Sequence, residues 1–113
     1  MGFILTRKDV ISLNQRFEDG TINNIGSLEY SLSYAKKTEN WTKALAYLTR
    51  AILIDHVFSD GNKRTTALLI KSYATYEGHQ VINSRLVRII KNVILKNITS
   101  IKKIEEMIKD VIK

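Results

Sequence analysis

The 113-residue chain contains no proline, and its apolar residues recur at helical spacing along almost its whole length. Proline would break such helices, and no stretch has the strict apolar–polar alternation that is typical of a strand. Linker-like composition and internal repeats are also absent. The sequence therefore predicts an all-α protein, with about six helices packed in one compact bundle that forms a single domain over residues 1–113.

Helix-capping residues divide this pattern into segments. Thr6 followed by Asp9 has the spacing of a capping box. The predicted helices span the segments 6–17, 27–37, 40–55, 62–77, 84–94 and 100–111. Their expected N-caps, where a polar side chain precedes an apolar pattern, are Thr6, Ser27, Asn40, Ser84 and Ser100. The polar loop 18–26 contains two glycines, and a short β-hairpin there is an alternative to an irregular loop.

The chain has no cysteine, which excludes disulfides and thiolate metal sites and is compatible with a reducing compartment. Its first apolar run, Phe3 to Leu5, is too short for a signal segment, and no run approaches membrane-spanning length. We therefore expect a cytoplasmic protein without a membrane partner.

The net charge is +7, and many of the excess lysines lie beyond residue 85 on the polar faces of helices. Those lysines are not interleaved with aromatic residues, as a surface that stacks nucleic-acid bases would be. This pattern favours a solvated face or an acidic partner over nucleic acid.

The run from His56 to Arg64, HVFSDGNKR, concentrates the chemically capable residues between two apolar helical segments. Gly61 permits a close approach of the backbone, and successive N–H groups of Gly61, Asn62 and Lys63 could form an anion nest at a helix start. Lys63 and Arg64 would add full positive charges. The run is therefore a candidate phosphate site.

Two residues of the run suggest what accompanies the phosphate. The Asp60 carboxylate would repel an anion unless a divalent cation bridges them, and Mg²⁺ with nucleotide phosphates is the common case. His56 can accept a proton near neutral pH. The alternative is an ordinary turn in which Asp60 or Asn62 caps the next helix and the histidine has no catalytic role.

The run resembles the signature of the Fic/Doc (Fido) family, H-x-F-x-[DE]-[GA]-N-[GK]-R. Every fixed position is matched, by His56, Phe58, Asp60, Gly61, Asn62, Lys63 and Arg64. The resemblance implies that His56 is the general base toward a target hydroxyl, that Asp60 holds Mg²⁺, and that Gly61, Asn62 and Arg64 bind the phosphates of ATP. Phe58 would anchor the loop in the core.

Lys63 points to the Doc-like branch of the family. Relatives that transfer AMP usually have Gly there and a second Arg three residues past the first, where this chain has Ala67. Doc toxins carry the Lys and transfer the γ-phosphate of ATP to a translation elongation factor. The resemblance therefore favours a protein kinase over an adenylyltransferase. Position 61 is Gly where some Doc proteins have Ala, and either residue is small enough for the loop.

Partners follow from the same resemblance. In Doc-like relatives a mobile loop beside the motif docks the target protein, and the loop 22–26 would take that role, with a plain surface connection as the alternative. The inhibitory helix motif (Ser/Thr)-x-x-x-Glu-(Gly/Asn) is not met, because Tyr73 precedes Glu77 and Ala35 precedes Glu39. A separate antitoxin chain is therefore expected.

Rival interpretations are a catalytically silent binding module with a basic surface and a nucleic-acid-binding helical domain.

Overall fold

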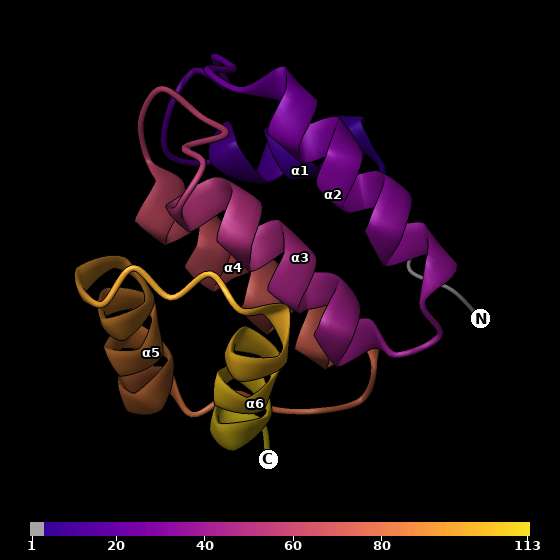
Figure 1. Cartoon of the computed structure of the whole chain (residues 1–113), viewed down its shortest axis with the longest axis vertical. Coiled ribbons are helices and arrows are strands. Elements are labelled where there is room, and N and C mark those ends of the chain that lie inside the picture. The colour runs from indigo at the N-terminus through magenta and orange to yellow at the C-terminus, as the bar shows by residue number, and fades with distance from the viewer. Residues whose placement is uncertain (1–3) are drawn as a thin grey trace.

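The computed structural model describes residues 4–113 and contains six helices connected by loops (Figure 1). They are α1 (Arg7–Asn14), α2 (Ile25–Lys37), α3 (Trp41–Leu53), α4 (Asn62–Tyr76), α5 (Asn83–Leu95) and α6 (Ile101–Val111). The predicted all-α bundle of about six helices is confirmed.

Helix α3 lies in the middle of the bundle. It packs against α2 and α4 and also contacts α5 and α6, while α1 packs on α4. In Figure 1, α1 and α2 lie on one side of α3 and α5 and α6 on the other. This central position explains why α3 is so apolar, with Ala44, Leu45 and Leu48 fully buried along its length.

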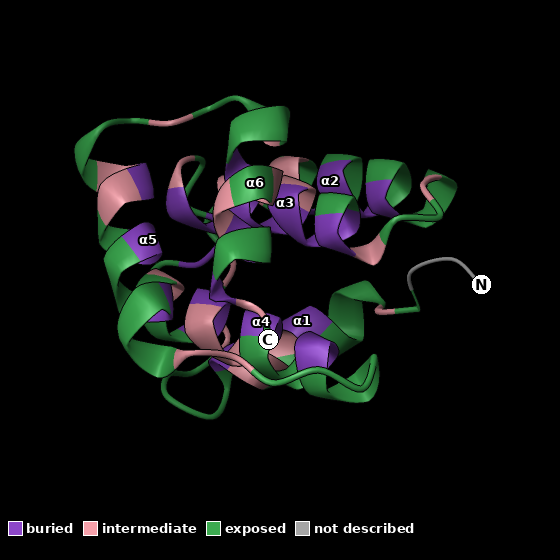
Figure 2. Ribbon diagram, turned by 90° about the horizontal axis from the view of Figure 1, so that it is seen from below, coloured by how far each residue is buried: buried purple, intermediate pink, exposed green. Residues whose placement is uncertain are grey.

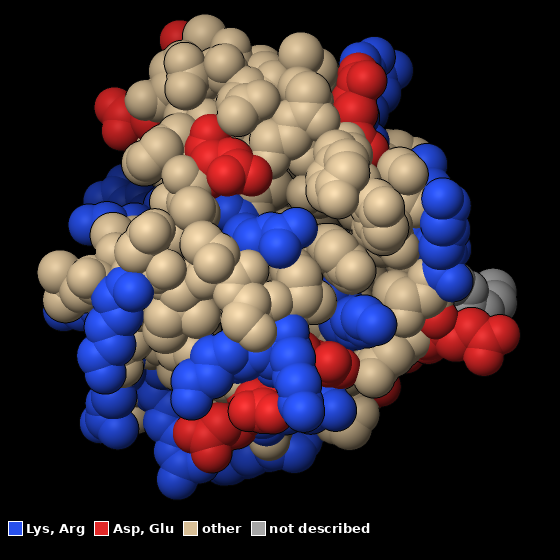
Figure 3. Space-filling model, in the orientation of Figure 1, with Lys and Arg blue, Asp and Glu red and all other residues tan. Residues whose placement is uncertain are grey.

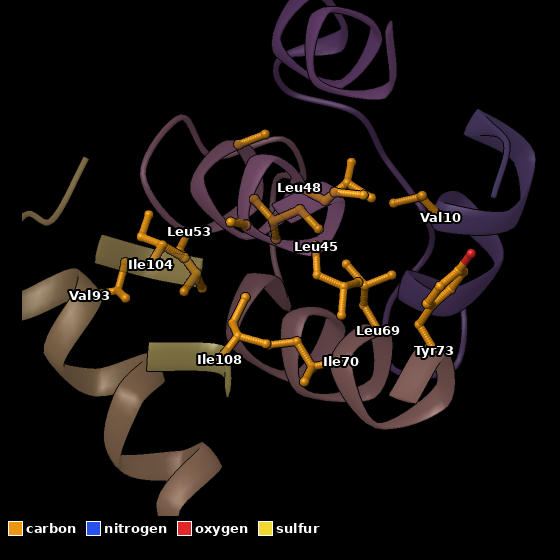
Figure 4. Packing of buried hydrophobic residues seen from close by; sticks show 14 of the residues in the cluster. Val10, Leu45, Leu48, Leu53, Leu69, Ile70, Tyr73, Val93, Ile104 and Ile108 are labelled. Atoms are coloured by element: carbon orange, nitrogen blue, oxygen red, sulfur yellow. The ribbon is translucent and has the colours of Figure 1, made fainter. Parts of the chain in front are cut away.

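The core is contiguous and is formed by one apolar face of each helix. Figure 4 shows part of it, with Leu45, Leu48 and Leu53 of α3 among residues of α1, α4, α5 and α6. In Figure 2 the helices are buried where they face one another and exposed on their outer sides. The predicted amphipathic spacing therefore corresponds to the observed core.

Of the five predicted N-caps three are confirmed and two are wrong, and α4 begins at Asn62 as predicted. Thr6 forms a capping box with Asp9, and Asn40 and Ser100 cap α3 and α6. Helix α2 begins earlier than predicted, because Asn24 rather than Ser27 supplies the cap and accepts a hydrogen bond from the Ser27 N–H. Helix α5 begins at Asn83, after Ile82, without a side-chain cap.

The first helix is shorter than predicted, and the described residues of the 18–26 loop form no β-hairpin. The N–H groups of Phe17 and Glu18 both donate to the Asn14 carbonyl, which ends α1 in a turn and leaves Phe17 38% exposed. In the described residues, the loop before α2 forms one isolated antiparallel bridge, between Ile22 and Phe58. It pairs with the 56–61 loop instead of with itself.

No helix in the described part of the chain combines the length and apolar character needed to cross a membrane.

Candidate functional site

A cavity of about 520 Å³ lies where the loop after α3 meets the start of α4. Leu53 and Ile94 supply its apolar walls, and Glu18 approaches from the loop after α1. The predicted site residues all line this cavity: His56, Asp60, Gly61, Asn62, Lys63 and Arg64. The structure thus brings them together around one space large enough for a small ligand.

Asn62 closes the loop on itself. Its side-chain Oδ1 accepts from the Phe58 N–H at 3.1 Å, and its Nδ2 donates to the Phe58 carbonyl at 2.9 Å. Phe58 is 1% exposed, so the expected anchoring of the loop in the core is confirmed. Because the Asn62 carboxamide is used within the loop, an anion would meet the backbone N–H of this residue instead.

The N-terminus of α4 lines the cavity, and the first N–H groups of this helix point out of that end. Gly61 is the N-cap, in the left-handed region at φ +76°, and Thr65 donates the first helical hydrogen bond to the Gly61 carbonyl at 2.9 Å. The N–H groups of Asn62, Lys63 and Arg64 precede that bond and have no intrahelical acceptor. This is the geometry that suits a bound anion.

Position 61 does not accept alanine as freely as the sequence suggested. A Cβ atom there would lie 2.7 Å from Cγ of Glu18 and 3.2 Å from Nδ2 of Asn14. The positive φ angle adds backbone strain for any residue with a side chain. Alanine would therefore require the Glu18 side chain to move.

His56 holds an unusual backbone conformation at the edge of the cavity. Its φ angle is +53°, in the left-handed region that a residue with a side chain seldom adopts. The Asn23 side chain donates to the His56 carbonyl at 3.1 Å, and the Asn23 N–H donates to the Val57 carbonyl at 2.8 Å. Such locally enforced strain is common at functional sites.

Asp60 is held by its own loop. Its Oδ1 accepts from the Gly61 N–H at 2.9 Å, and its backbone carbonyl accepts from Nδ2 of Asn14 at 2.9 Å. The described residues contain no cluster of three or more side chains able to ligate a metal. Mg²⁺ typically uses one or two carboxylates together with nucleotide phosphates, so Asp60 on this cavity fits a metal that arrives with its nucleotide.

Asn14 was not among the residues predicted for the site. This fully buried residue donates to both the Asp60 carbonyl and the Thr65 hydroxyl, and its Oδ1 accepts from the Gly20 N–H at 3.0 Å. It therefore ties α1 to the loop and to α4. The available signal was a polar side chain four residues after Val10, on the inward stripe of the helix.

The segment after α1 contributes two further residues. Glu18 lines the cavity opposite Gly61, and the Arg64 guanidinium lies 5.7 Å from the centre of the Phe17 ring. A cation over a ring face is weakly attracted to it. Phe17 thus sits against a predicted phosphate-binding side chain instead of in the core.

We expect Asn14→Ala to lower the free energy of unfolding by about 2–3 kcal/mol, because it leaves buried partners without a hydrogen bond. Urea denaturation would measure the loss. Asn83→Ala is the matched control, because this exposed residue begins α5 and should change stability by less than about 0.5 kcal/mol. Equal stability of the two variants would contradict the positioning role of Asn14.

Comparison of the chain with protein-family models, with curated proteins and with solved structures finds no match.

Proposed function

We propose that the protein transfers a phosphoryl group from Mg-ATP to a hydroxyl side chain of a target protein. The observation that carries this proposal is the position of His56, whose strained backbone sets the imidazole on the same cavity as Asp60 and the start of α4. A base, a metal-binding carboxylate and an anion site are the parts that phosphoryl transfer needs. The resemblance of this run to the Doc-like branch supports the same reaction.

The residues have separate roles in this reaction. The triphosphate binds the free N–H groups of Asn62, Lys63 and Arg64, and the two cationic side chains offset its charge. Asp60 would hold Mg²⁺, which when bound neutralises charge that develops on the phosphates. His56 takes the proton of the target hydroxyl as its oxygen forms a bond to the γ-phosphorus, and the bond from that phosphorus to the β-phosphate oxygen breaks to release ADP.

Adenylyl transfer is the principal alternative. It uses the same base and carboxylate but attacks the α-phosphorus, so the orientation of the nucleotide separates the two reactions. The resemblance favours the phosphoryl reaction, because the chain has Lys63 where adenylyltransferases usually have Gly and Ala67 where they have a second Arg. A catalytically silent binding module with a basic surface is a further alternative.

The proposal includes a docking segment and a cellular setting. In the docking loop predicted at residues 22–26, the Asn23 and Asn24 N–H groups donate to the Val57 carbonyl, and residues 25 and 26 already belong to α2. A target chain lying along this loop would bring its hydroxyl to His56.

We propose a cytoplasmic toxin acting on a target such as a translation elongation factor, restrained by a separate antitoxin chain.

Incubation of the protein with cell lysate, Mg²⁺ and ATP labelled at either the γ or the α position tests the reaction. The proposal predicts a protein band labelled only from the γ position. Label from the α position would indicate adenylyl transfer, and the absence of label from both would reject the enzymatic interpretation.

We expect Lys63→Gly to raise the ratio of α-derived to γ-derived label, because it removes a bulky cation from the start of α4 and allows another nucleotide orientation. The same double-label assay measures the ratio. Lys102→Gly is the matched control, because Lys102 occupies the same second position of α6. An unchanged ratio in Lys63→Gly would contradict the role of Lys63 in orienting the nucleotide.

A further inference from the structure

Tyrosines and cations of α2 and α3 form a continuous array on the outer side of the bundle, away from the candidate site. The Tyr30 and Tyr34 ring centres are 4.8 Å apart, and Tyr34 stacks on Tyr47 at 5.4 Å. Lys37 Nζ lies 5.4 Å from the Tyr34 ring centre, and Arg50 Cζ lies 5.7 Å from that of Tyr47. We call these five residues the tyrosine–cation face.

Helical spacing explains the array. Tyr30, Tyr34 and Lys37 follow one stripe of α2, while Tyr47 and Arg50 follow the facing stripe of α3. The opposite stripe of α2, with Leu28, Leu32 and Ala35, already supplies the core. Tyr30 and Tyr34 remain 54% and 40% exposed, so packing of the bundle does not account for two large aromatic residues at these positions.

The charged residues that line the groove beside these rings are basic. A groove of about 270 Å³ between the two helices is lined by Tyr34, Lys37, Thr38, Lys43 and Tyr47, and no carboxylate lines it. In Figure 3 the surface over the middle of α2 and α3 is mostly uncharged with separate basic groups, acidic groups lie towards the ends of these two helices, and over α6 basic and acidic groups are mixed. The groove therefore complements negative charge.

We propose that the tyrosine–cation face binds an acidic segment of a partner protein, with several carboxylates in a short stretch. Tyrosine and arginine are the residues most enriched among binding hot spots. Cations fixed over rings lose less freedom on binding than free side chains do.

The arrangement of the rings favours carboxylates over nucleic-acid bases. Single-stranded nucleic acid binds by stacking its bases on exposed ring faces. Here Tyr34 faces Tyr47 on one side and Lys37 lies over its ring, while Arg50 lies over Tyr47. Two of the three rings are therefore covered in part by another ring or a cation, and Lys37 offers the positive charge that carboxylates recognise. None of these residues lines the candidate cavity, so this surface is independent of the proposed reaction.

Fluorescence anisotropy with a labelled glutamate dodecapeptide, and with an oligouridylate of matched charge, tests the surface. Removal of two positive charges in Lys37→Gln/Lys43→Gln should weaken peptide binding about tenfold. Lys91→Gln/Lys102→Gln removes the same charge from exposed positions on α5 and α6 and should change binding less than about twofold. Tyr34→Ala should weaken binding as much as the first pair, and Tyr34→Phe should keep the ring and part of the affinity.

Three outcomes would overturn the proposal. Equal losses in the two lysine pairs would mean general charge attraction without a site. Tighter binding of the oligouridylate, lost in Tyr34→Ala, would make the surface a nucleic-acid site. An absence of peptide binding by the unaltered protein would reject it directly. Because the substituted side chains are exposed, thermal unfolding of each variant should match that of the unaltered protein.

Discussion

His56→Asn is expected to lower the rate of γ-phosphate transfer to the target protein by about 10²–10⁴-fold, the usual contribution of a general base. Asparagine is the appropriate replacement, because it tolerates the left-handed backbone that His56 adopts at φ +53° better than other residues with side chains. The variant therefore removes the imidazole and keeps the loop. Single-turnover transfer of labelled phosphate measures the rate.

The second histidine of the chain supplies a matched control. His79 is exposed, follows the opposite end of α4, and does not line the cavity. His79→Asn should transfer phosphate at the unaltered rate. Activity of His56→Asn within about threefold of the His79 variant would be incompatible with general-base catalysis by His56.

Asp60→Asn is expected to lower transfer by about 10³-fold or more, because it removes the carboxylate that would hold Mg²⁺ and with it several kcal/mol of charge stabilisation. The amide oxygen can still accept the hydrogen bond that Asp60 Oδ1 receives from the Gly61 N–H. The loop should therefore keep its conformation, and urea denaturation should give nearly unaltered stability.

Raising the Mg²⁺ concentration distinguishes loss of metal binding from a structural effect. Weak residual activity of Asp60→Asn should increase with Mg²⁺ over a range in which the unaltered protein is saturated. Asp110→Asn, on the exposed side of α6, is the control and should behave as the unaltered protein. Full activity of Asp60→Asn at ordinary Mg²⁺ concentration would exclude Asp60 as the metal-binding residue.

Local signals predicted most of the fold. The apolar stripes of α3 and α6 depend on spacing within one helix, and the Asn40 and Ser100 caps depend on residues a few positions away. The predicted start of α2 was wrong because Asn24 and Ser27 are both residue types that cap helices well. A contact distant in sequence favours Asn24, whose Nδ2 donates to the Asp55 carbonyl at 3.1 Å.

The candidate site likewise combines residues that local sequence reveals with contacts between residues distant in sequence. Most of its lining comes from the run 56–64, so the sequence alone could name His56 and Asp60, whereas Glu18, Leu53 and Ile94 reach the cavity from elsewhere in the chain. Asn14 acts on residues that are far along the chain, at Asp60 and Thr65, and no local pattern reveals such a contact. The bridge between Ile22 and Phe58 is equally non-local.

The tyrosine–cation face is a surface that could not be predicted from the sequence. Beyond residue 85 the lysines are not interleaved with aromatic residues, so the sequence showed no sign of an aromatic surface there. The observed array joins Tyr34 of α2 to Tyr47 of α3, which requires the two helices to be packed side by side. Only the tertiary structure brings these rings and cations together.

The most direct measurement is a crystal structure of the protein with Mg²⁺ and a non-hydrolysable ATP analogue. We predict triphosphate density against the N–H groups of Asn62, Lys63 and Arg64, the metal on the Asp60 carboxylate, and the His56 imidazole facing the γ-phosphate. An analogue bound elsewhere, or a His56 side chain turned away from the bound phosphates, would contradict the proposed transfer reaction.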